Sequence, residues 1–435
     1  MEAYLDNAAT TRVSEKVAEL AQKLFMTDYG NPSSKHNKGL DAERYIKDAA
    51  EIIAESLKVQ PKEIIFTSGG TESNNMALVG AALANKRKGT HIIASGFEHA
   101  SVYNPLLSLE DFGFSVDFAP VDSMGHIIID ELLNLIREDT VMVSIMYVNN
   151  EIGAVQDIAA ISKAVKAKKS DIIFHVDAIQ AFGKYVIRPK REGIDLLSVS
   201  GHKIHGPKGS GFLYADSGIK LRPLIFGGGQ QKNRRSGTEN VPAIAGLGLA
   251  VKEIYENHTE KFDRIYGLKA RLIKGILGVP GTYVNGVFSE EDLKSEAYTG
   301  YAEALRKKEA QGNPHEMPDN DKATARECEN AFDDLLNEAV RKTAPHVISV
   351  SFEGIKSEVL LHALEEKNIY VSSGSACSSN HPGISSTLKA IGVKKNLLDS
   401  TLRFSLSVNN TEEEIDYCIE MLKNLVPIYN RFSRK

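Results

Sequence analysis

The sequence predicts an α/β protein, in which a mainly parallel sheet of seven strands lies between helices, followed by a smaller α+β domain. Two observations favour this fold class. Short apolar runs alternate with segments of helical periodicity through the first half of the chain. The chain of 435 residues is also too long for one ordinary hydrophobic core, which indicates two domains.

The apolar runs predict buried strands, because both faces of a parallel sheet are covered and its strands lack polar alternation. The seven runs are Ile64–Phe66, Ile92–Ala94, Val116–Ala119, Val141–Val148, Ile172–Val176, Leu196–Val199 and Gly211–Tyr214. The helical segments include Asp41–Lys58, Glu72–Arg87, Asp130–Arg137 and Ile158–Lys168. In such sheets ligands bind beyond the carboxyl ends of the strands, so polar residues that follow these runs are the first candidates for a site.

A different pattern follows, helical from Val241 to Lys274 and then mixed. It predicts strands at Val347–Phe352, Ile369–Val371 and Leu402–Val408, and helices at Glu358–Lys367 and Glu412–Ile428. We therefore expect a large domain over residues 13–255 and a small domain formed by residues 1–12, an extended arm, and 256–435. The charged stretch at about 288–344 is an unusual insertion, with one or two surface helices around a flexible middle.

Composition excludes several classes of function. The apolar fraction of 42% and charged fraction of 25% are those of a soluble globular protein. The net charge of −5, without a basic stripe, argues against nucleic acid as a partner, and no run approaches the roughly 20 apolar residues of a membrane span. There is no signal-peptide pattern, and the three cysteines have neither pairing nor metal spacing. We expect a cytoplasmic protein.

The stretch from Asp195 to Tyr214 is the centre of the predicted site. A buried strand ends in Ser200, Gly201, His202 and Lys203 before a Gly/Pro-rich turn. A lysine held there would be partly desolvated, which makes its neutral amine available as a Schiff-base nucleophile. The alternative is an ordinary surface lysine at a strand end.

Two more strand ends carry candidate groups. The segment from Phe66 to Met76 is a strand, a glycine turn and a helix start, where backbone N–H groups and the Thr71 hydroxyl could hold an anion; an ordinary helix cap is the alternative. Asp177 ends a buried strand and needs a partner, either a cofactor's pyridinium nitrogen or an arginine. Gln180 follows it and could donate to a ring oxygen.

The remaining candidates are a histidine, a cysteine and an arginine. His99 follows a strand and could stack on a ring, act as an acid or base, or be structural. Cys377 lies in a polar, Ser/Gly-rich segment, which is typical of a reactive thiol and not of a cysteine in an apolar core. Cys418, within a helical pattern, is expected to be a core cysteine. The role of Cys328 is left undecided. Arg403 in a strand indicates either carboxylate capture or a structural salt bridge.

In combination these segments resemble the cysteine desulfurases of the class V aminotransferase-like family, which are fold type I pyridoxal-phosphate enzymes of iron–sulfur assembly. The similarity runs in family order across nearly the whole chain. The matching segments are Tyr4–Thr11, Gly30–Ser34, Phe66–Asn75, Asn149–Gly153, His175–Gln180, Ser198–Gly211, Gly227–Gln230, Arg235–Pro242, Ser372–Cys377 and Leu402–Leu406.

The resemblance implies a role for each candidate. Lys203 would form the Schiff base with pyridoxal 5'-phosphate, Asp177 would bind the ring nitrogen, Gln180 the phenolic oxygen, and His99 would stack on the ring. The phosphate would be held by Thr71, Ser200 and His202 and, from the other subunit of a homodimer, by Thr238. Asn150 and Arg403 would position the substrate, and Cys377 would accept its sulfur.

The implied reaction converts L-cysteine into L-alanine and a persulfide on Cys377, which passes its sulfur to an acceptor protein such as a cluster scaffold or a thiolation enzyme. A selenocysteine lyase and a class V aminotransferase are the alternative enzymes, and a non-catalytic sulfur-carrier scaffold is the alternative of another class. Two departures from the family pattern stand out, the long insertion at 288–344 and the less typical residues 231–234.

Overall fold

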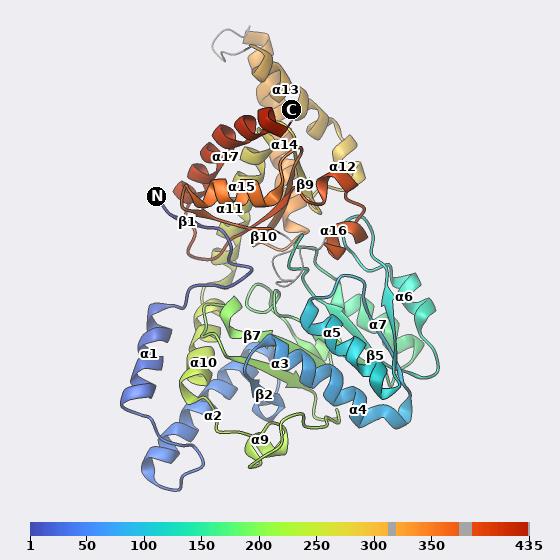
Figure 1. Cartoon of the computed structure of the whole chain (residues 1–435), viewed down its shortest axis with the longest axis vertical. Helices are drawn as coiled ribbons and strands as arrows, with labels where there is room; N and C mark the ends of the chain where they lie inside the picture. Colours follow the sequence, from blue (N-terminus) through green and yellow to red (C-terminus); the bar gives the residue numbers. More distant parts are fainter. Residues whose placement is uncertain (312–318, 374–384, 434–435) are drawn as a thin grey trace.

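The computed structural model describes residues 1–311, 319–373 and 385–433, which form two packed domains (Figure 1). The large domain, lower in Figure 1, is built on a seven-stranded sheet, and the small domain above it on a four-stranded sheet. The predicted fold class is confirmed. The exact domain bounds of 13–255 and 256–435 stay a prediction.

All seven predicted strands are present in the large sheet, in the order β2-β8-β7-β6-β5-β3-β4. Strands β4, β3, β5, β6 and β7 are mutually parallel, whereas β8 runs antiparallel to β7 and β2. Their bounds are β2 Ile64–Thr67, β3 His91–Ser95, β4 Ser115–Ala119, β5 Thr140–Met146, β6 Ile173–Asp177, β7 Leu196–Ser200 and β8 Gly211–Ala215. The carboxyl ends of β3, β5, β6 and β7 therefore meet at one edge, which lies toward the small domain.

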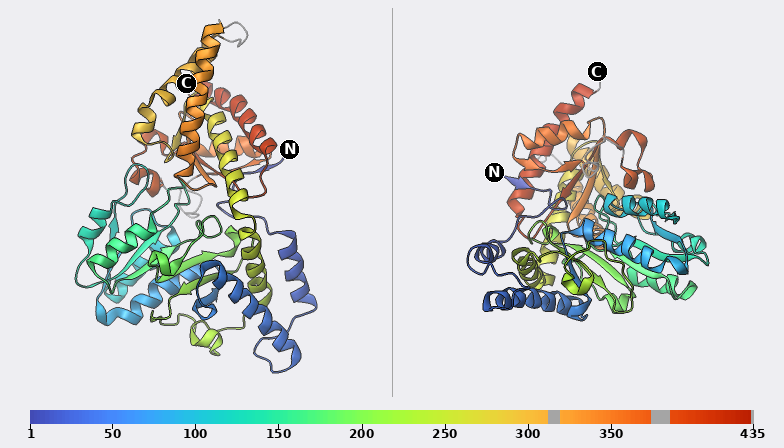
Figure 2. Two further views of the ribbon diagram at one scale, coloured as in Figure 1. Left: turned by 180° about the vertical axis from the view of Figure 1, so that it is seen from behind. Right: turned by 60° about the horizontal axis from the view of Figure 1, so that its bottom comes forward.

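Helices cover both faces of this sheet, as Figures 1 and 2 show. They are α1 Glu15–Met26, α2 Asn37–Leu57, α3 Gly70–Asn75, α4 Ala81–Asn85, α5 Ala100–Ser108, α6 Ile129–Leu135, α7 Ile158–Lys168, α8 Pro189–Glu192, α9 Gln230–Asn233 and α10 Val241–Tyr255. A π-helical turn, Met76–Gly80, joins α3 to α4, so the helix predicted at Glu72–Arg87 is present but begins earlier, at Gly70.

The small domain contains a strand that the sequence pattern did not predict, β9 Thr282–Asn285, at the edge of the sheet β12-β13-β10-β9. The other strands are β10 Val347–Phe352, β12 Ser372–Ser373 and β13 Thr401–Ser405, and the N-terminal arm adds β1 Ala3–Tyr4, paired with β11 Ile369–Tyr370. The helices are α11 His258–Leu277, α12 Glu290–Lys294, α13 Glu296–Gln311, α14 Asp319–Arg341, α15 Ser357–Glu365, α16 Ser386–Ala390 and α17 Glu412–Ser433.

The insertion forms a helical hairpin, α13 and α14, that projects from the small domain at the top of Figure 1. Surface helices were expected, but this holds for only part of the hairpin. The C-terminal half of α14 packs into the core of the small domain through Phe332, Leu336 and Val340, which are fully buried. The Phe332 ring also stacks on Tyr301 of α13, with centroids 4.0 Å apart. The middle of the insertion, for which flexibility was expected, lies outside the described residues.

Candidate active site

The predicted lysine and aspartate lie at the same edge of the large sheet. Asp177 is the last residue of β6, and Lys203 follows the neighbouring strand β7 after a single turn, Gly201–Lys203. Because β6 and β7 are parallel neighbours, their ends bring the carboxylate and the amine to one place. The positive charges of His99 and Lys203 both act to lower the pKa of Asp177, which places all three groups within electrostatic reach.

Asp177 is anchored from two sides. It is 2% exposed, and its Oδ1 accepts a hydrogen bond from the backbone N–H of Ile179 at 2.9 Å. Its Oδ2 accepts one from Asn74 Nδ2, also at 2.9 Å. Burial is the dominant effect on this carboxyl and raises its pKa, so a positively charged partner is needed to hold it as a carboxylate.

A chain of hydrogen bonds connects Asp177 to His99. The Asn74 amide also donates to Ser101 Oγ at 3.0 Å, and that hydroxyl lies 2.8 Å from His99 Nδ1. His99 is the N-cap of α5, where its Nδ1 accepts from the Ser101 backbone N–H at 3.0 Å. The imidazole orientation is therefore set by the helix start and by the same network that holds Asp177.

The start of α3 provides the predicted anion cradle. No side chain of the described residues caps this helix, so its first N–H groups are available to a ligand. Gly69 adopts φ 148°, which favours glycine, and a Cβ on Gly70 would lie 2.3 Å from the Ile179 side chain, which would have to shift. Thr71 is exposed at the second position of the helix, and buried Ser200 lies opposite Gly69.

Two other predicted groups are held by the N-terminal arm. Lys203 Nζ donates to the backbone oxygens of Ala8 at 2.6 Å and Ala9 at 2.7 Å. Gln180 Nε2 donates to the same Ala8 oxygen at 3.0 Å, and its Oε1 lies 3.0 Å from His346 Nε2. The arm thus lies against Lys203 and supplies acceptors for its amine.

The third predicted phosphate ligand, His202, faces the arm as well. Its Nδ1 lies 3.2 Å from Thr10 Oγ1. Burial, helped by the neighbouring lysines, lowers the pKa of His202 to about 4, so the ring is neutral at pH 7 and offers one N–H donor.

The predicted substrate residues meet at the boundary between the domains. Arg403 of β13 donates to Asp6 Oδ1 at 3.0 Å and to the backbone oxygen of Asn150 at 2.9 Å, while its buried Nε has no hydrogen-bond partner among the described residues. Of the two alternatives for Arg403, the salt bridge is thus present, and the guanidinium still has N–H donors for a ligand. Thr238 is exposed on the loop before α10, away from these groups, and Cys377 lies outside the described residues.

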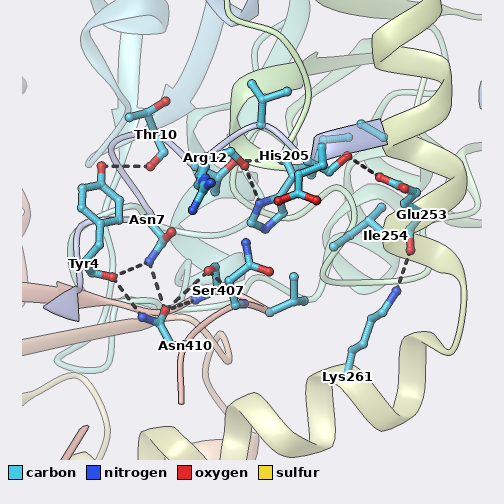
Figure 3. A pocket seen from close by; sticks show the side chains of 18 of the residues that line it. Tyr4, Asn7, Thr10, Arg12, His205, Glu253, Ile254, Lys261, Ser407 and Asn410 are labelled. Carbon is cyan, nitrogen blue, oxygen red and sulfur yellow. Dashed lines mark hydrogen bonds between the residues drawn. The ribbon is translucent and has the colours of Figure 1, made fainter. Parts of the chain in front are cut away.

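The candidate site is identified by its titratable side chains and not by the volume of a cavity. A cavity of about 870 Å³ lies on the other side of the arm, between Tyr4, His205, Glu253 and Asn410 (Figure 3). None of the predicted site residues lines it. A second cavity, of about 20 Å³, is lined by Lys203 together with Lys184 and His346. We assign the site to the sheet edge because the titratable groups converge there.

Sequence reasoning missed several residues of the site. Asn74 lies in the segment from Phe66 to Met76, and Ser101 lies two residues after His99. That both are polar and close to the start of a helix could have indicated that they belong to the site. Glu98 precedes His99, and its Oε1 accepts from Ser95 and from the Met146 backbone N–H. Burial, with a contribution from Asp177, raises the pKa of Glu98 to about 8, so it is mostly protonated at pH 7.

Comparison with known proteins identifies the family. The model of the family described as aminotransferase class-V matches residues 3–297 and 297–418. The chain belongs to this family. Relatives of this member are a protein from Methanosarcina thermophila named cysteine desulfurase IscS, 39% identical over 97% of the chain and 91% of that protein, and the putative cysteine desulfurase IscS 1 of Bacillus subtilis, 37% identical over 97% and 98%.

Solved structures agree with the class-V fold. A structure described as a NifS-like protein superposes with a TM-score of 0.82 at 32% identity and covers 98% of the chain and 100% of its own. A second, described as SspA in complex with cysteine, has a TM-score of 0.68 at 30% identity and covers 94% and 100%. The resemblance inferred from the motifs is confirmed.

Class-V enzymes depend on pyridoxal 5'-phosphate, and the residues of this site fit that group. The buried Asp177 carboxylate suits a pyridinium nitrogen, because an isolated charge at its position is costly. The uncapped start of α3 suits a phosphate, and Lys203 suits the aldehyde. The chain thus carries a matching group for the ring nitrogen, the phosphate and the aldehyde of the cofactor.

Proposed function

We propose that this class-V protein is a cysteine desulfurase, which removes the sulfur of L-cysteine and leaves L-alanine and a persulfide on Cys377. The observation that carries the proposal is the position of Lys203 and a buried Asp177 at one edge of the sheet, in a chain that matches named cysteine desulfurases over 97% of its length. The site supports chemistry at an amino-acid Cα, and the relatives support cysteine as the substrate.

The proposed binding roles are supported by where these side chains lie and by the family resemblance. Asp177 would hold the ring nitrogen, Gln180 the phenolic oxygen and His99 the ring. The phosphate would be held by the start of α3 together with Thr71, Ser200 and His202. Arg403, which has an unpartnered Nε, binds the substrate carboxylate beside Asn150.

The catalytic roles concern proton and sulfur transfer. When bound, the cofactor withdraws electrons from the substrate Cα through its protonated ring. Lys203 removes the proton from Cα and returns it to carbon. The Cys377 thiolate bonds to the substrate sulfur as the carbon–sulfur bond breaks; the electron pair stays on carbon, which gains protons and becomes alanine. Cysteine and the enzyme thiol thus yield alanine and an enzyme persulfide, with no further oxidant.

A homodimer belongs to the proposal, because Thr238 is exposed and would reach the phosphate of a second copy. Large exposed apolar side chains near the same end support such an interface; they include Phe25 at 65%, Met26 at 74% and Phe226 at 74% exposure. We also propose a cytoplasmic protein that delivers sulfur to an acceptor for cluster assembly or another thio-cofactor. No helix among the described residues is long and apolar enough to cross a membrane.

The test measures alanine and sulfide formed from L-cysteine, with mass spectrometry for one added sulfur on Cys377. Cys377→Ser is expected to abolish sulfide release and to leave the Lys203 linkage to the cofactor intact. Selenide release that survives in this variant would favour a selenocysteine lyase, and retained amino transfer to a keto acid would favour an aminotransferase. Absence of a lysine-linked cofactor in the parent protein would favour the non-catalytic scaffold.

A further inference from the structure

We propose that Lys184 is a positioning residue that fixes the main chain of Lys203 and disfavours a positive charge on the Lys203 amine. The inference rests on the proposed role of Lys203 as the nucleophile toward the cofactor aldehyde. Only the neutral amine can attack an aldehyde carbon, where a C–N bond forms and water leaves. A residue that keeps this amine neutral near pH 7 therefore prepares the enzyme to be loaded.

The contact is direct. Lys184 lies in the segment after β6, four residues beyond Gln180, and its Nζ donates to the backbone oxygen of Lys203 at 2.7 Å. Lys184 is half-buried, and together with Lys203 it lines the cavity of about 20 Å³. The hydrogen bond holds the turn that carries Lys203 at the end of β7.

The electrostatics around Lys184 disfavour the state in which Lys184 and Lys203 are both protonated. Burial, the larger cause, and the charge of Lys203 together lower the pKa of Lys184 to about 7. The repulsion is mutual, so the two amines titrate as a coupled pair. Because two adjacent ammonium groups are costly in a partly desolvated site, the pair holds fewer than two protons near pH 7.

The other charged groups around the pair do not cancel this effect. His202, His205 and His346 face it from the β7 turn and from the start of β10, and burial lowers the pKa of each, so they are neutral at pH 7. Among the described residues, Asp6 and Asp177 are carboxylates on whose pKa the charge of Lys203 has a lowering effect. Asp6 is bonded to Arg403, and Asp177 is assigned to the cofactor ring.

The experiment measures at which pH Lys203 becomes reactive, independently of turnover. Apoprotein is mixed with pyridoxal 5'-phosphate across a pH series and reduced with cyanoborohydride, and the label on the Lys203 peptide is quantified by mass spectrometry. Lys184→Met is expected to raise the midpoint by about one pH unit. Lys184→Gln, which keeps an N–H donor for the Lys203 oxygen without a charge, is expected to raise it equally.

Three outcomes are distinguished by controls. Lys163→Met removes an exposed lysine and is expected to leave the midpoint unchanged. If Lys184→Gln keeps the parent midpoint, the inferred charge effect is overturned, whatever Lys184→Met does to folding. Lys184→Arg keeps the charge and should hold the midpoint at or below that of the parent. If the parent protein never labels Lys203, the proposed function fails, and not this inference.

Discussion

Two lysines, the half-buried Lys184 in the large domain and the fully buried Lys269 in the small domain, have the same pKa of about 7 for partly different reasons. Lys184 is affected by burial and by the charge of Lys203, whereas burial alone lowers the pKa of Lys269. Lys269 Nζ donates to Thr343 Oγ1 at 2.6 Å and to the Ala344 backbone oxygen at 2.7 Å, just after α14.

The comparison teaches that a perturbed pKa does not by itself mark catalysis. Lys269 ties the end of the insertion to α11, and Ala344 in turn donates from its backbone N–H to Gly153 at 2.8 Å. The role of Lys269 is to fix the main chain at the end of the insertion. Lys184, by contrast, lies beside a second lysine, Lys203, which belongs to the candidate site. Perturbed groups also occur in structural networks, and the neighbours decide between the two roles.

The largest effect is expected at the sheet edge. Lys203→Ala removes the amine that binds the aldehyde and moves the Cα proton, so kcat should fall by about 10³-fold or more. Alanine formation from L-cysteine measures this effect. Lys269→Met is the matched change at the other buried lysine and should leave kcat within about twofold of the parent; a collapse of turnover in Lys269→Met would contradict the division between the two lysines.

The next largest effect is expected on stability, at the root of the insertion, where the C-terminal half of α14 packs into the small domain. Phe332→Ala empties a fully buried site between α14 and α13 and should lower the free energy of unfolding by about 3–5 kcal/mol. Denaturant unfolding followed by circular dichroism measures it. The absorbance of the lysine-linked cofactor should survive at low denaturant, since Phe332 is remote from the sheet edge; a loss below 1 kcal/mol would show that the hairpin root is not part of the core.

A third prediction concerns the pH dependence of the free energy of unfolding that Lys269 causes. Its folded pKa of about 7 lies below the unfolded value of about 10.4, so the unfolded chain binds more protons between these values. The contribution of Lys269 to the free energy of unfolding therefore rises with pH from about 7 to about 10 and is at its lowest below pH 7. Lys269→Met should reduce the slope of the parent in that window, as urea unfolding at each pH will report. An unchanged slope would mean that Lys269 is charged in the fold.

The smallest effect is expected on the surface of the insertion. Lys294 and Glu290 form an exposed pair one helical turn apart in α12, 3.2 Å between Nζ and Oε2. Lys294→Ala should change the free energy of unfolding by about 0.5 kcal/mol or less, because exposed pairs are screened by water and salt. The thermal midpoint measures it, and a shift of the size expected for Phe332→Ala would be inconsistent with an exposed helix.

Much of the site could be predicted from local patterns. The apolar runs predict β6 and β7, and parallel neighbours end at one edge, so the positions of Asp177 and Lys203 at strand ends could be predicted from periodicity, whereas their roles came from the family resemblance. Asn74 and Ser101 could not be assigned roles, because Asn74 contacts Asp177 and Ser101 across different strand–helix units.

The sequence by itself determined where the strands of the large domain lie along the chain, the glycine turn at α3 and the polar residues at the strand ends. These features depend on residues that are close in the chain. Only the tertiary structure decided that Arg403 pairs with Asp6, 397 residues away, and that α14 enters the core of the small domain. It alone brought Lys184 to the backbone of Lys203. Such contacts depend on which surfaces exclude water together, and no local periodicity records that choice.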